Sequence, residues 1–441
     1  MEEQNSELLE KIRHQFDTGP YPRHPIEASP QGNNNFLFIH NIVTPFYLRN
    51  KSVVNPQGKV ILDAGCGSGY KALALAAANP GAKIVGIDLS EESVKLARKR
   101  LAHHGIENSE FHCLSIEELP KLGQTFDYIN CDDVLYLLPD LVLGLQSLKL
   151  VLKPQGIIRG NLHSLFQRGV YYRAQDVFKM MGLMESNPGD MEIAIVQEVM
   201  KSLKDDIYLK QTTWKTSREN DPEFYLANYL LQGDKGYTIP ELFASLSAAN
   251  LEFINMVNWR HWDLTELFQS PDDLPTFLAM SLPGLEIEDQ LHLFELLQPI
   301  HRLLDFWCGH PNPAEPFLPV EEWTESDWDT TRVHLHPQLK TAQVKENLID
   351  CIGYQRPFEV SRYLSAPTVI PLKVGSGIAS CLLPLWEGPQ SVPSLVERWL
   401  KIRPLNPVTL EPVSQNQAFQ EVVGFLSNLE VFLYVLLERL A

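Results

Sequence analysis

Several residue patterns are missing from this chain of 441 residues, and each absence narrows the classes of function. The six cysteines form no Cys-x-x-Cys pair, which argues against a structural zinc site and a disulfide framework and fits a reducing cytosol. No apolar run approaches the roughly 18 residues of a membrane-spanning helix. The acidic first residues do not resemble a signal peptide. We therefore predict a cytoplasmic protein with no membrane span and no metal site.

Basic residues are outnumbered, with 37 Lys and Arg against 55 Asp and Glu and a formal net charge of −18. Nucleic-acid surfaces favour basic patches, so general nucleic-acid binding is not expected. A Gly-x-x-x-x-Gly-Lys-Ser/Thr phosphate loop is also missing. The length suits two or three domains. No internal repeat is present, and the sequence does not predict an oligomeric state.

The most informative segment that is present is 60–69, Val-Ile-Leu-Asp-Ala-Gly-Cys-Gly-Ser-Gly. Glycines let the backbone turn sharply and approach a ligand closely. A second acid, Asp88, ends the next apolar run and is followed by Leu89. This order of elements, a strand, a Gly-rich turn, a helix, a second strand and an acid, predicts a nucleotide-type cofactor site at the carboxyl ends of parallel strands. The turn holds Asp63, Gly65, Cys66, Gly67 and Gly69.

The glycine spacing in this turn narrows the cofactor. A dinucleotide site has Gly-x-Gly-x-x-Gly, with the pyrophosphate at a helix N-terminus, whereas Gly65, Gly67 and Gly69 are one residue more tightly spaced. Asp63 precedes them, and a carboxylate there would repel a pyrophosphate. An ammonium or a sulfonium would be attracted instead.

At these residues the chain resembles the class I S-adenosylmethionine-dependent methyltransferases, whose first motif is Asp/Glu-x-Gly-x-Gly-x-Gly. Residues 126–129 match the family's fourth strand and 152–156 the turn before its fifth, so the resemblance covers about 55–165. It implies a Rossmann-like, doubly wound α/β core that binds S-adenosyl-L-methionine. The cofactor residues that it implies are Asp63, Gly65, Cys66, Gly67, Gly69, Asp88, Leu89, Ser115, Ile116 and Asp132.

Three of these positions have alternative interpretations. Where the family often has an Asp that accepts from the adenine amine, this chain has Ser115, which can still accept, followed by Ile116, which can pack on the ring. Asp88 could instead cap the following helix, but Ser90 is the better cap and leaves Asp88 for the ribose. Cys66 fills a small turn position and is not expected to be a nucleophile.

Four segments are expected along the chain: an N-terminal arm or lid (1–54), the cofactor-binding core (55–165), a middle segment (166–310) on the acceptor side, and a separate C-terminal domain (321–441). In the arm, helical spacing predicts helices over 5–16 and 36–50, separated by a Pro-rich stretch. In the core, strands are predicted at 59–63, 83–88, 109–113, 126–131 and 156–162.

The middle segment departs from a standard methyltransferase domain, which would end within two strands of the fifth. It is either an elaborate insertion or a substitute for the end of the sheet. The order of segments is similar to a bacterial group that joins a methyltransferase core to a regulatory domain and includes protein-lysine methyltransferases. We predict helices at 166–185, 190–204, 222–233, 239–249 and 286–307, a strand at 251–259, and then a strand at 331–336 with helices at 392–401 and 416–440.

The acceptor side is expected at the ends of the fourth and fifth strands. Asp132 and Asp133 could orient a cationic amine, or one could cap a helix while the other is solvated. His163 is a candidate base, although a single His at a strand end is often structural. Cys131 lacks the preceding Pro of the cytosine-C5 enzymes and is more simply a buried strand residue. The residues 130–133 also lack the Asn/Asp-Pro-Pro-Tyr/Phe motif of many amine methyltransferases.

The N-terminal arm supplies two more candidate residues for the active site. Tyr21 could present its hydroxyl to the reacting groups, and Arg23 could pair with the cofactor carboxylate; alternatively, the arm only packs. The aromatic cluster 259–262 is predicted to be core. Accessory segments of this size favour methyl transfer to a protein side chain. The alternatives are a small-molecule O-, N- or C-methyltransferase and a non-catalytic scaffold that binds the cofactor.

Overall fold

A mixed sheet of eight strands forms the body of the computed structural model, which describes residues 10–17, 19–271, 273–312, 317–366 and 370–439. Its order is β3-β2-β1-β4-β5-β8-β7, with the short β6 beside β5. The strands β1 to β5 pair in parallel, while β8 lies antiparallel to both β5 and β7. The strands are β1 (Val60–Ala64), β2 (Lys83–Asp88), β3 (Ser109–Cys113), β4 (Phe126–Cys131), β5 (Leu152–Ser164), β6 (Gly236–Tyr237), β7 (Glu252–Met256) and β8 (Leu303–Gly309).

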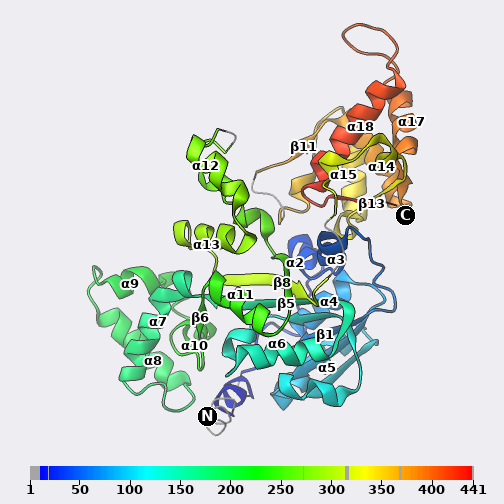
Figure 1. Cartoon of the computed structure of the whole chain (residues 1–441). Coiled ribbons are helices and arrows are strands. Elements are labelled where there is room, and N and C mark those ends of the chain that lie inside the picture. The colour runs from blue at the N-terminus through cyan, green and yellow to red at the C-terminus, as the bar shows by residue number, and fades with distance from the viewer. Residues whose placement is uncertain (1–9, 18, 272, 313–316, 367–369, 440–441) are drawn as a thin grey trace.

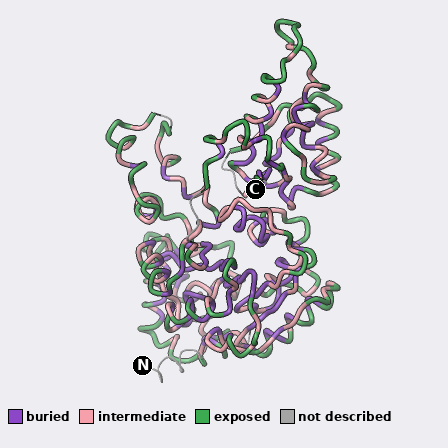
Figure 2. Tube along the Cα trace, turned by 45° about the vertical axis from the view of Figure 1, so that its right-hand side comes forward, coloured by how far each residue is buried: buried purple, intermediate pink, exposed green. Residues whose placement is uncertain are grey.

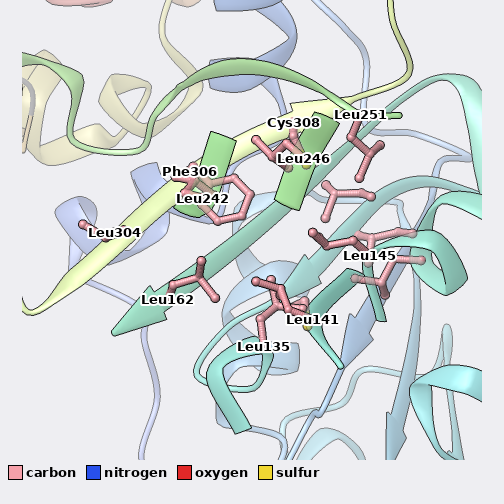
Figure 3. Close-up of a cluster of buried hydrophobic side chains, with 14 of the residues drawn as sticks. Leu135, Leu141, Leu145, Leu162, Leu242, Leu246, Leu251, Leu304, Phe306 and Cys308 are labelled. Atoms are coloured by element: carbon pink, nitrogen blue, oxygen red, sulfur yellow. The ribbon is translucent and has the colours of Figure 1, made fainter. Parts of the chain in front are cut away.

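Successive residues of these strands face opposite layers, because side chains alternate along a strand. Ile61 joins the cluster under α4 (Tyr70–Ala78) and α5 (Glu91–His103), whereas the adjacent Leu62 joins the cluster on the other face. That second cluster packs α6 (Leu141–Leu150) and α11 (Ile239–Ala248) on the sheet. Figure 3 shows several of its members: Leu141 and Leu145 of α6, Leu242 and Leu246 of α11, and Leu304, Phe306 and Cys308 of β8. The predicted doubly wound core is confirmed.

The prediction of one helix over 286–307 is wrong after residue 297. Helix α13 spans Ile287–Leu297, and the chain then enters β8 at Leu303. Pro299 lies between them and cannot continue a helix, since it lacks the N–H and clashes with the preceding turn. The leucine-rich run therefore divides into a helix and a strand that is buried on both faces.

Four helices follow β5 and form a separate packing unit, at the lower left of Figure 1. Their buried side chains, aromatic and aliphatic, make a cluster of their own that includes Phe178, Val196 and Tyr229. Because β7 and β8 complete the sheet later in the chain, this part of the middle segment is an insertion and does not replace the sheet's end. The helices are α7 (Leu165–Met180), α8 (Asp190–Ser202), α9 (Tyr208–Thr213) and α10 (Pro222–Asn228).

The C-terminal domain has its own small sheet, of order β12-β9-β13, and its own buried cluster. The predicted strand at 331–336 and helix at 392–401 are present as β9 and α17. The predicted helix over 416–440 ends early, because the apolar run beginning at Val435 pairs with β9 as a strand. The elements are β9 (Thr331–Leu335), α15 (Ala342–Gly353), β12 (Gln390–Ser391), α17 (Val392–Ile402), α18 (Gln415–Glu430) and β13 (Val435–Arg439).

The N-terminal segment connects these two bodies. Residues 10–17 are helical, and the rest of the helix predicted over 5–16 lies outside the described residues. The helix predicted over 36–50 is two helices, α2 (Asn34–Ile39) and α3 (Val43–Asn50). Figure 2 shows buried segments in both bodies. Tyr47 of α3 is fully buried in the C-terminal cluster, and its hydroxyl donates to Glu430 at 2.8 Å.

Candidate active site

The Gly-rich turn after β1 needs its glycines for conformation and for close packing. Gly65, Gly67 and Gly69 have φ angles of 80°, 49° and 81°, a region that side chains disfavour. A Cβ on Gly67 would lie 2.1 Å from the carbonyl oxygen of Tyr21, and one on Gly69 would lie 2.6 Å from Ala97 Cα on α5. The turn therefore depends on contact with the N-terminal arm and with the neighbouring helix.

Asp63 is the penultimate residue of β1, and only one of its two carboxylate oxygens has a hydrogen-bond partner. It is 1% exposed, and its Oδ1 accepts a hydrogen bond from Asn130 Nδ2 at 2.7 Å. Its Oδ2 is buried with no hydrogen-bond partner. Burial raises the pKa of Asp63 to about 6, against the lowering effect of Asn130. A buried carboxylate oxygen without a donor suits a cationic ligand.

Asp88 ends β2 and holds the turn from the other side. Its Oδ2 accepts from the Gly67 N–H at 2.8 Å, and its Oδ1 accepts from the Ser90 N–H at 2.9 Å. Burial raises the pKa of Asp88 despite these bonds. Ser90 caps α5 by accepting from Ser93 N–H at 3.1 Å, as predicted, while the binding of ribose by Asp88 stays a prediction. Free lone pairs remain on the carboxylate for ligand hydroxyls.

A cavity lies beside this turn, and most of the predicted cofactor residues line it. Asp63, Gly69 and Ser115 are not among the residues that line it, and Arg23 lines a neighbouring cavity instead. The predicted residues on the first cavity are Tyr21, Gly65, Cys66, Gly67, Asp88, Leu89, Ile116 and Asp132.

The loop after β3 forms the far end of the first cavity. Ser115 is the N-cap of a short 3-10 helix, where its hydroxyl and N–H lie 3.3 Å from the Glu118 carboxylate. Its side chain is therefore engaged within its own loop. Leu114, Ile116 and Glu117 line the cavity instead. From the sequence, Glu117 was not predicted as a residue of the cofactor site. Its position directly after Ile116, which was predicted to pack on the adenine, could have indicated it.

The helix over residues 10–17 covers part of the same cavity through Ile12, Arg13 and Phe16. The arm that follows is held on the turn by backbone contacts: Ser68 N–H donates to Tyr21 O at 2.8 Å, and Ser68 Oγ donates to Pro22 O at 2.7 Å. The buried Arg100 of α5 donates to the carbonyls of Ser68, His24 and Pro25. Charge and apolar periodicity in the sequence gave no signal for these long-range contacts.

Two acids follow β4 and share one lysine. Lys71 Nζ lies 2.9 Å from Asp132 Oδ2 and 2.9 Å from Asp133 Oδ2. Burial alone would raise the pKa of Asp132, but Arg159 and Lys71 hold it well below its usual range. Lys71 and Arg302 likewise lower the pKa of Asp133 against burial. Both carboxylates are therefore ionised at neutral pH.

A second cavity adjoins the first on its insertion side. The two share Phe16, Tyr21, Asp133 and Leu137, so Asp133 borders both, whereas Asp132 borders only the first. Burial, and then the Asp133 charge, raise the pKa of Tyr21. The remaining walls of the second cavity come from the N-terminal segment, from the segment after β4, from β5, from the insertion and the residues that follow it, and from the segment before β8. They are Gln15, Gly19, Arg23, Tyr136, His163, Glu223, Leu226, Ala227, Leu231 and Arg302.

His163 lines the second cavity with both ring nitrogens occupied. Arg302 can only donate, so His163 Nε2 accepts from Arg302 at 3.1 Å, and Nδ1–H donates to the buried Asp234 at 2.6 Å. The ring also stacks on Tyr136 at 3.6 Å between centroids. Burial lowers the pKa of His163 to about 4, although Asp234 acts to raise it. His163 is thus neutral at physiological pH, and its lone pair faces a guanidinium.

The cysteines of the site do not act as nucleophiles. Cys66 and Cys131 are both buried, and burial raises the pKa of each thiol. Trp262, from the predicted aromatic core cluster, is buried and stacks on His301 at 4.4 Å. Among the described residues, no group of three or more His, Cys, Asp or Glu could hold a metal ion, and no helix there is long and apolar enough to cross a membrane.

The residues that line the first cavity, together with Asp63 two residues before Gly65, fit S-adenosylmethionine. The partnerless Asp63 oxygen suits its cationic methionine part, and Gly67 lines the cavity with backbone alone. Asp88 presents a carboxylate for the ribose hydroxyls, and Ile116 with Glu117 forms the end suited to the base. A negative charge at Asp63 would oppose a dinucleotide pyrophosphate.

Comparison with known proteins agrees with this assignment. Residues 55–228 match a family model described as a methyltransferase domain. An uncharacterised protein of Synechococcus is 27% identical over 71% of this chain and 73% of its own length. A ubiquinone biosynthesis O-methyltransferase of Actinobacillus pleuropneumoniae is 35% identical over 29% of this chain and 56% of its own length. The structure of PKMT2 from Rickettsia typhi with AdoHcy covers 92% of this chain and 76% of that chain, at 17% identity and a TM-score of 0.58.

The sheet order, the Gly-rich turn and the two strand-end acids define a class I, Rossmann-like methyltransferase core with a helical insertion and a C-terminal domain. The protein is an S-adenosylmethionine-dependent methyltransferase.

Proposed function

We propose that this methyltransferase modifies a protein side chain, and that the acceptor is an alkyl amine. The observation that carries the proposal is the second cavity, which shares Asp133 with the cofactor cavity and is lined by Glu223 and several apolar side chains as well. Phe16, Leu137 and Leu226 suit the stem of one extended side chain. Two carboxylates suit a cationic end. A cytoplasmic location and a protein partner remain predictions.

When bound, S-adenosylmethionine supplies a methyl group that is already activated as a sulfonium. The protein must then hold the acceptor in line and exclude water, since alignment alone contributes many powers of ten. Asp133 borders both cavities and is placed to hold the amine at their junction. Tyr21 borders both as well and comes from the arm that covers the site.

An ammonium must lose a proton before it can accept a methyl group. Burial raises the pKa of Glu223, although the nearby Arg23 acts to lower it. A carboxylate with a raised pKa is a better proton acceptor than Asp133, whose pKa is lowered. We therefore assign Glu223 as the base that takes the proton from the ammonium. His163 is not assigned this role, because its Nε2 already accepts from Arg302.

The test is transfer of a labelled methyl group from S-adenosylmethionine into host lysate by the full chain. Label in a discrete protein band that disappears with Glu223→Gln supports the proposal. Label only in the low-mass fraction would favour the small-molecule alternative. Binding without label in either fraction, with Asp63→Asn as the non-binding control, would favour a scaffold that only binds the cofactor.

A further inference from the structure

Lys71 occupies an unusual position for a charged residue. It lies in the first turn of α4, two residues after Gly69, and lines the cofactor cavity. Its ammonium is nevertheless directed at the end of β4, with contacts to Asp132 Oδ2 at 2.9 Å, Asp133 Oδ2 at 2.9 Å and the Asp132 carbonyl at 3.3 Å. An ammonium has three N–H groups, so all of them are engaged by these two residues.

Asp133 has an unusual backbone conformation, and several partners hold its backbone and carboxylate in place. Its φ angle is 63°, which is uncommon for a residue other than glycine. Its N–H donates to Asn161 Oδ1 at 2.9 Å. Its carboxylate receives Lys71 on Oδ2, while Arg302 and the Tyr136 hydroxyl lie 3.3 Å and 3.4 Å from Oδ1. Backbone strain that is held by several partners is typical of functional sites.

We propose that Lys71 is a positioning residue for methyl transfer: its ammonium holds the carboxylate of Asp133 ionised and directed at the junction of the two cavities, where the acceptor is oriented. The inference rests on the proposed function, because it assigns Asp133 the acceptor. Lys71 is not assigned to the cofactor carboxylate, since its three N–H groups are already used on the two acids.

The surroundings of Asp133 explain why this single lysine matters. Asp132 is a second carboxylate on the same ammonium, and without Lys71 the two acids would repel each other in a buried setting. Two adjacent carboxylates do not readily ionise together, so the Asp132 charge raises the pKa of Asp133 where the Lys71 charge does not oppose it. The titratable and charged groups facing Asp133 are Lys71 from α4, Arg302 from the segment before β8, Tyr136 after β4, Tyr21 from the arm, Asp132 beside it, and Asp305 and Arg159 behind Asp132.

The experiment compares Lys71→Gln, Lys71→Arg and wild type by labelled transfer at pH 6 and pH 8, each relative to wild type at the same pH. The ratio cancels the acceptor's own titration. Lys71→Gln should lose more transfer at pH 6 than at pH 8, because without the ammonium the pKa of Asp133 rises and the acid limb of the profile moves up. Lys71→Arg keeps the charge and should restore the wild-type profile. Lys153→Gln, which removes one of two lysines from Asp127 at the other end of the sheet, is the matched control.

Two further measurements make the inference falsifiable. In an Asp133→Asn background, adding Lys71→Gln should change transfer by less than about threefold, since partners in one network are not additive. An equal loss in both backgrounds would overturn the inference. A large fall in S-adenosylmethionine affinity of Lys71→Gln by calorimetry would assign Lys71 to the cofactor and overturn it as well. Label that appears only in the low-mass fraction would contradict the proposed protein acceptor, while the same variant ratios would still test Lys71.

Discussion

The carbonyl oxygen of Tyr21 occupies the space that a side chain on Gly67 would need, with a hypothetical Cβ only 2.1 Å away. The same carbonyl accepts the N–H of Ser68 at 2.8 Å. The arm and the Gly-rich turn are therefore one unit, although 46 residues separate Tyr21 from Gly67 along the chain. Because Tyr21 also lines both cavities, the fit between these two backbones sets the shape of the cofactor site and of the acceptor site together.

Gly67→Ala should displace the arm and weaken S-adenosylmethionine binding by about tenfold or more, which corresponds to about 1.4 kcal/mol. The reason is the clash with the Tyr21 carbonyl, added to the strain of a positive φ. Gly58→Ala is the matched control, because Gly58 has a φ of 75° with open space where its Cβ would lie. Isothermal calorimetry measures both, and equal affinities for the two variants would contradict the close fit.

Asp63→Asn should abolish cofactor binding and yet stabilise the free protein at pH 8. The folded carboxyl has a pKa of about 6 and its ordinary value is 3.8, so its favourable contribution is complete below pH 3.8 and is lost as the pH rises through 6. At pH 8 the ionised, buried carboxylate lowers the free energy of unfolding by roughly 2–3 kcal/mol, at about 1.4 kcal/mol per pKa unit, and the substitution removes this charge. Asn keeps the acceptor for Asn130.

Denaturant unfolding at pH 8 and pH 4 checks the stability of Asp63→Asn, since the gain should shrink at the lower pH. Calorimetry of the wild type should show cofactor affinity falling as the pH drops through about 6. A wild-type affinity that stays constant from pH 8 to pH 5 would contradict the expected link between cofactor affinity and the ionisation of Asp63, whose pKa is raised to about 6.

His163→Ala should slow transfer while leaving S-adenosylmethionine affinity unchanged, because His163 supports Arg302 and lies outside the first cavity. With a pKa of about 4, it should contribute no limb to the pH–rate profile between pH 6 and pH 8. The profile of His163→Ala should therefore keep the wild-type shape at a lower rate. A limb near pH 6.5 that disappears in the variant would restore His163 as the base.

Arg100→Met should release the arm. Arg100 donates to three carbonyls, those of Ser68, His24 and Pro25, and each one left buried without a donor costs about 1–3 kcal/mol. The expected results are a lower Tm and faster dissociation of the cofactor product. Stopped-flow displacement measures the dissociation, and Arg173→Met, whose guanidinium packs on Tyr208 of the insertion, is a control away from the arm.

Tyr47→Phe should destabilise the protein by about 1–3 kcal/mol without changing cofactor affinity, because it removes an acceptor from the buried Leu437 N–H and a donor from Glu430. Thermal unfolding and calorimetry separate the two quantities. A loss of affinity that equals the loss of stability would indicate that the C-terminal domain is energetically coupled to the cofactor site.

The sequence was informative where structure is local. The turn 63–69, the acid Asp88 and the cap Ser90 lie within a few residues of the strands that position them, so spacing alone located them. The acceptor side was different, since Arg302 meets His163 across 139 residues and Lys71 meets Asp133 across 62. The periodicity of apolar residues along the sequence does not predict which residues pair over such distances. The same limit explains the strands at 303–309 and 435–439, whose sheet partners lie far away in the chain.

Helix α3 is synthesised long before its partners. Tyr47 packs in the C-terminal cluster and donates to Glu430, which lies 383 residues later in the chain. At a typical ribosomal rate of about 5–20 residues per second, roughly 20 s or more separate the two during synthesis. Throughout that interval the methyltransferase sheet can form, while the face of α3 that carries Val43 and Tyr47 remains exposed because the C-terminal domain has not yet been synthesised. A nascent chain of this protein should therefore pass through a stage in which its cofactor core is complete but its N-terminal helix still depends on a chaperone.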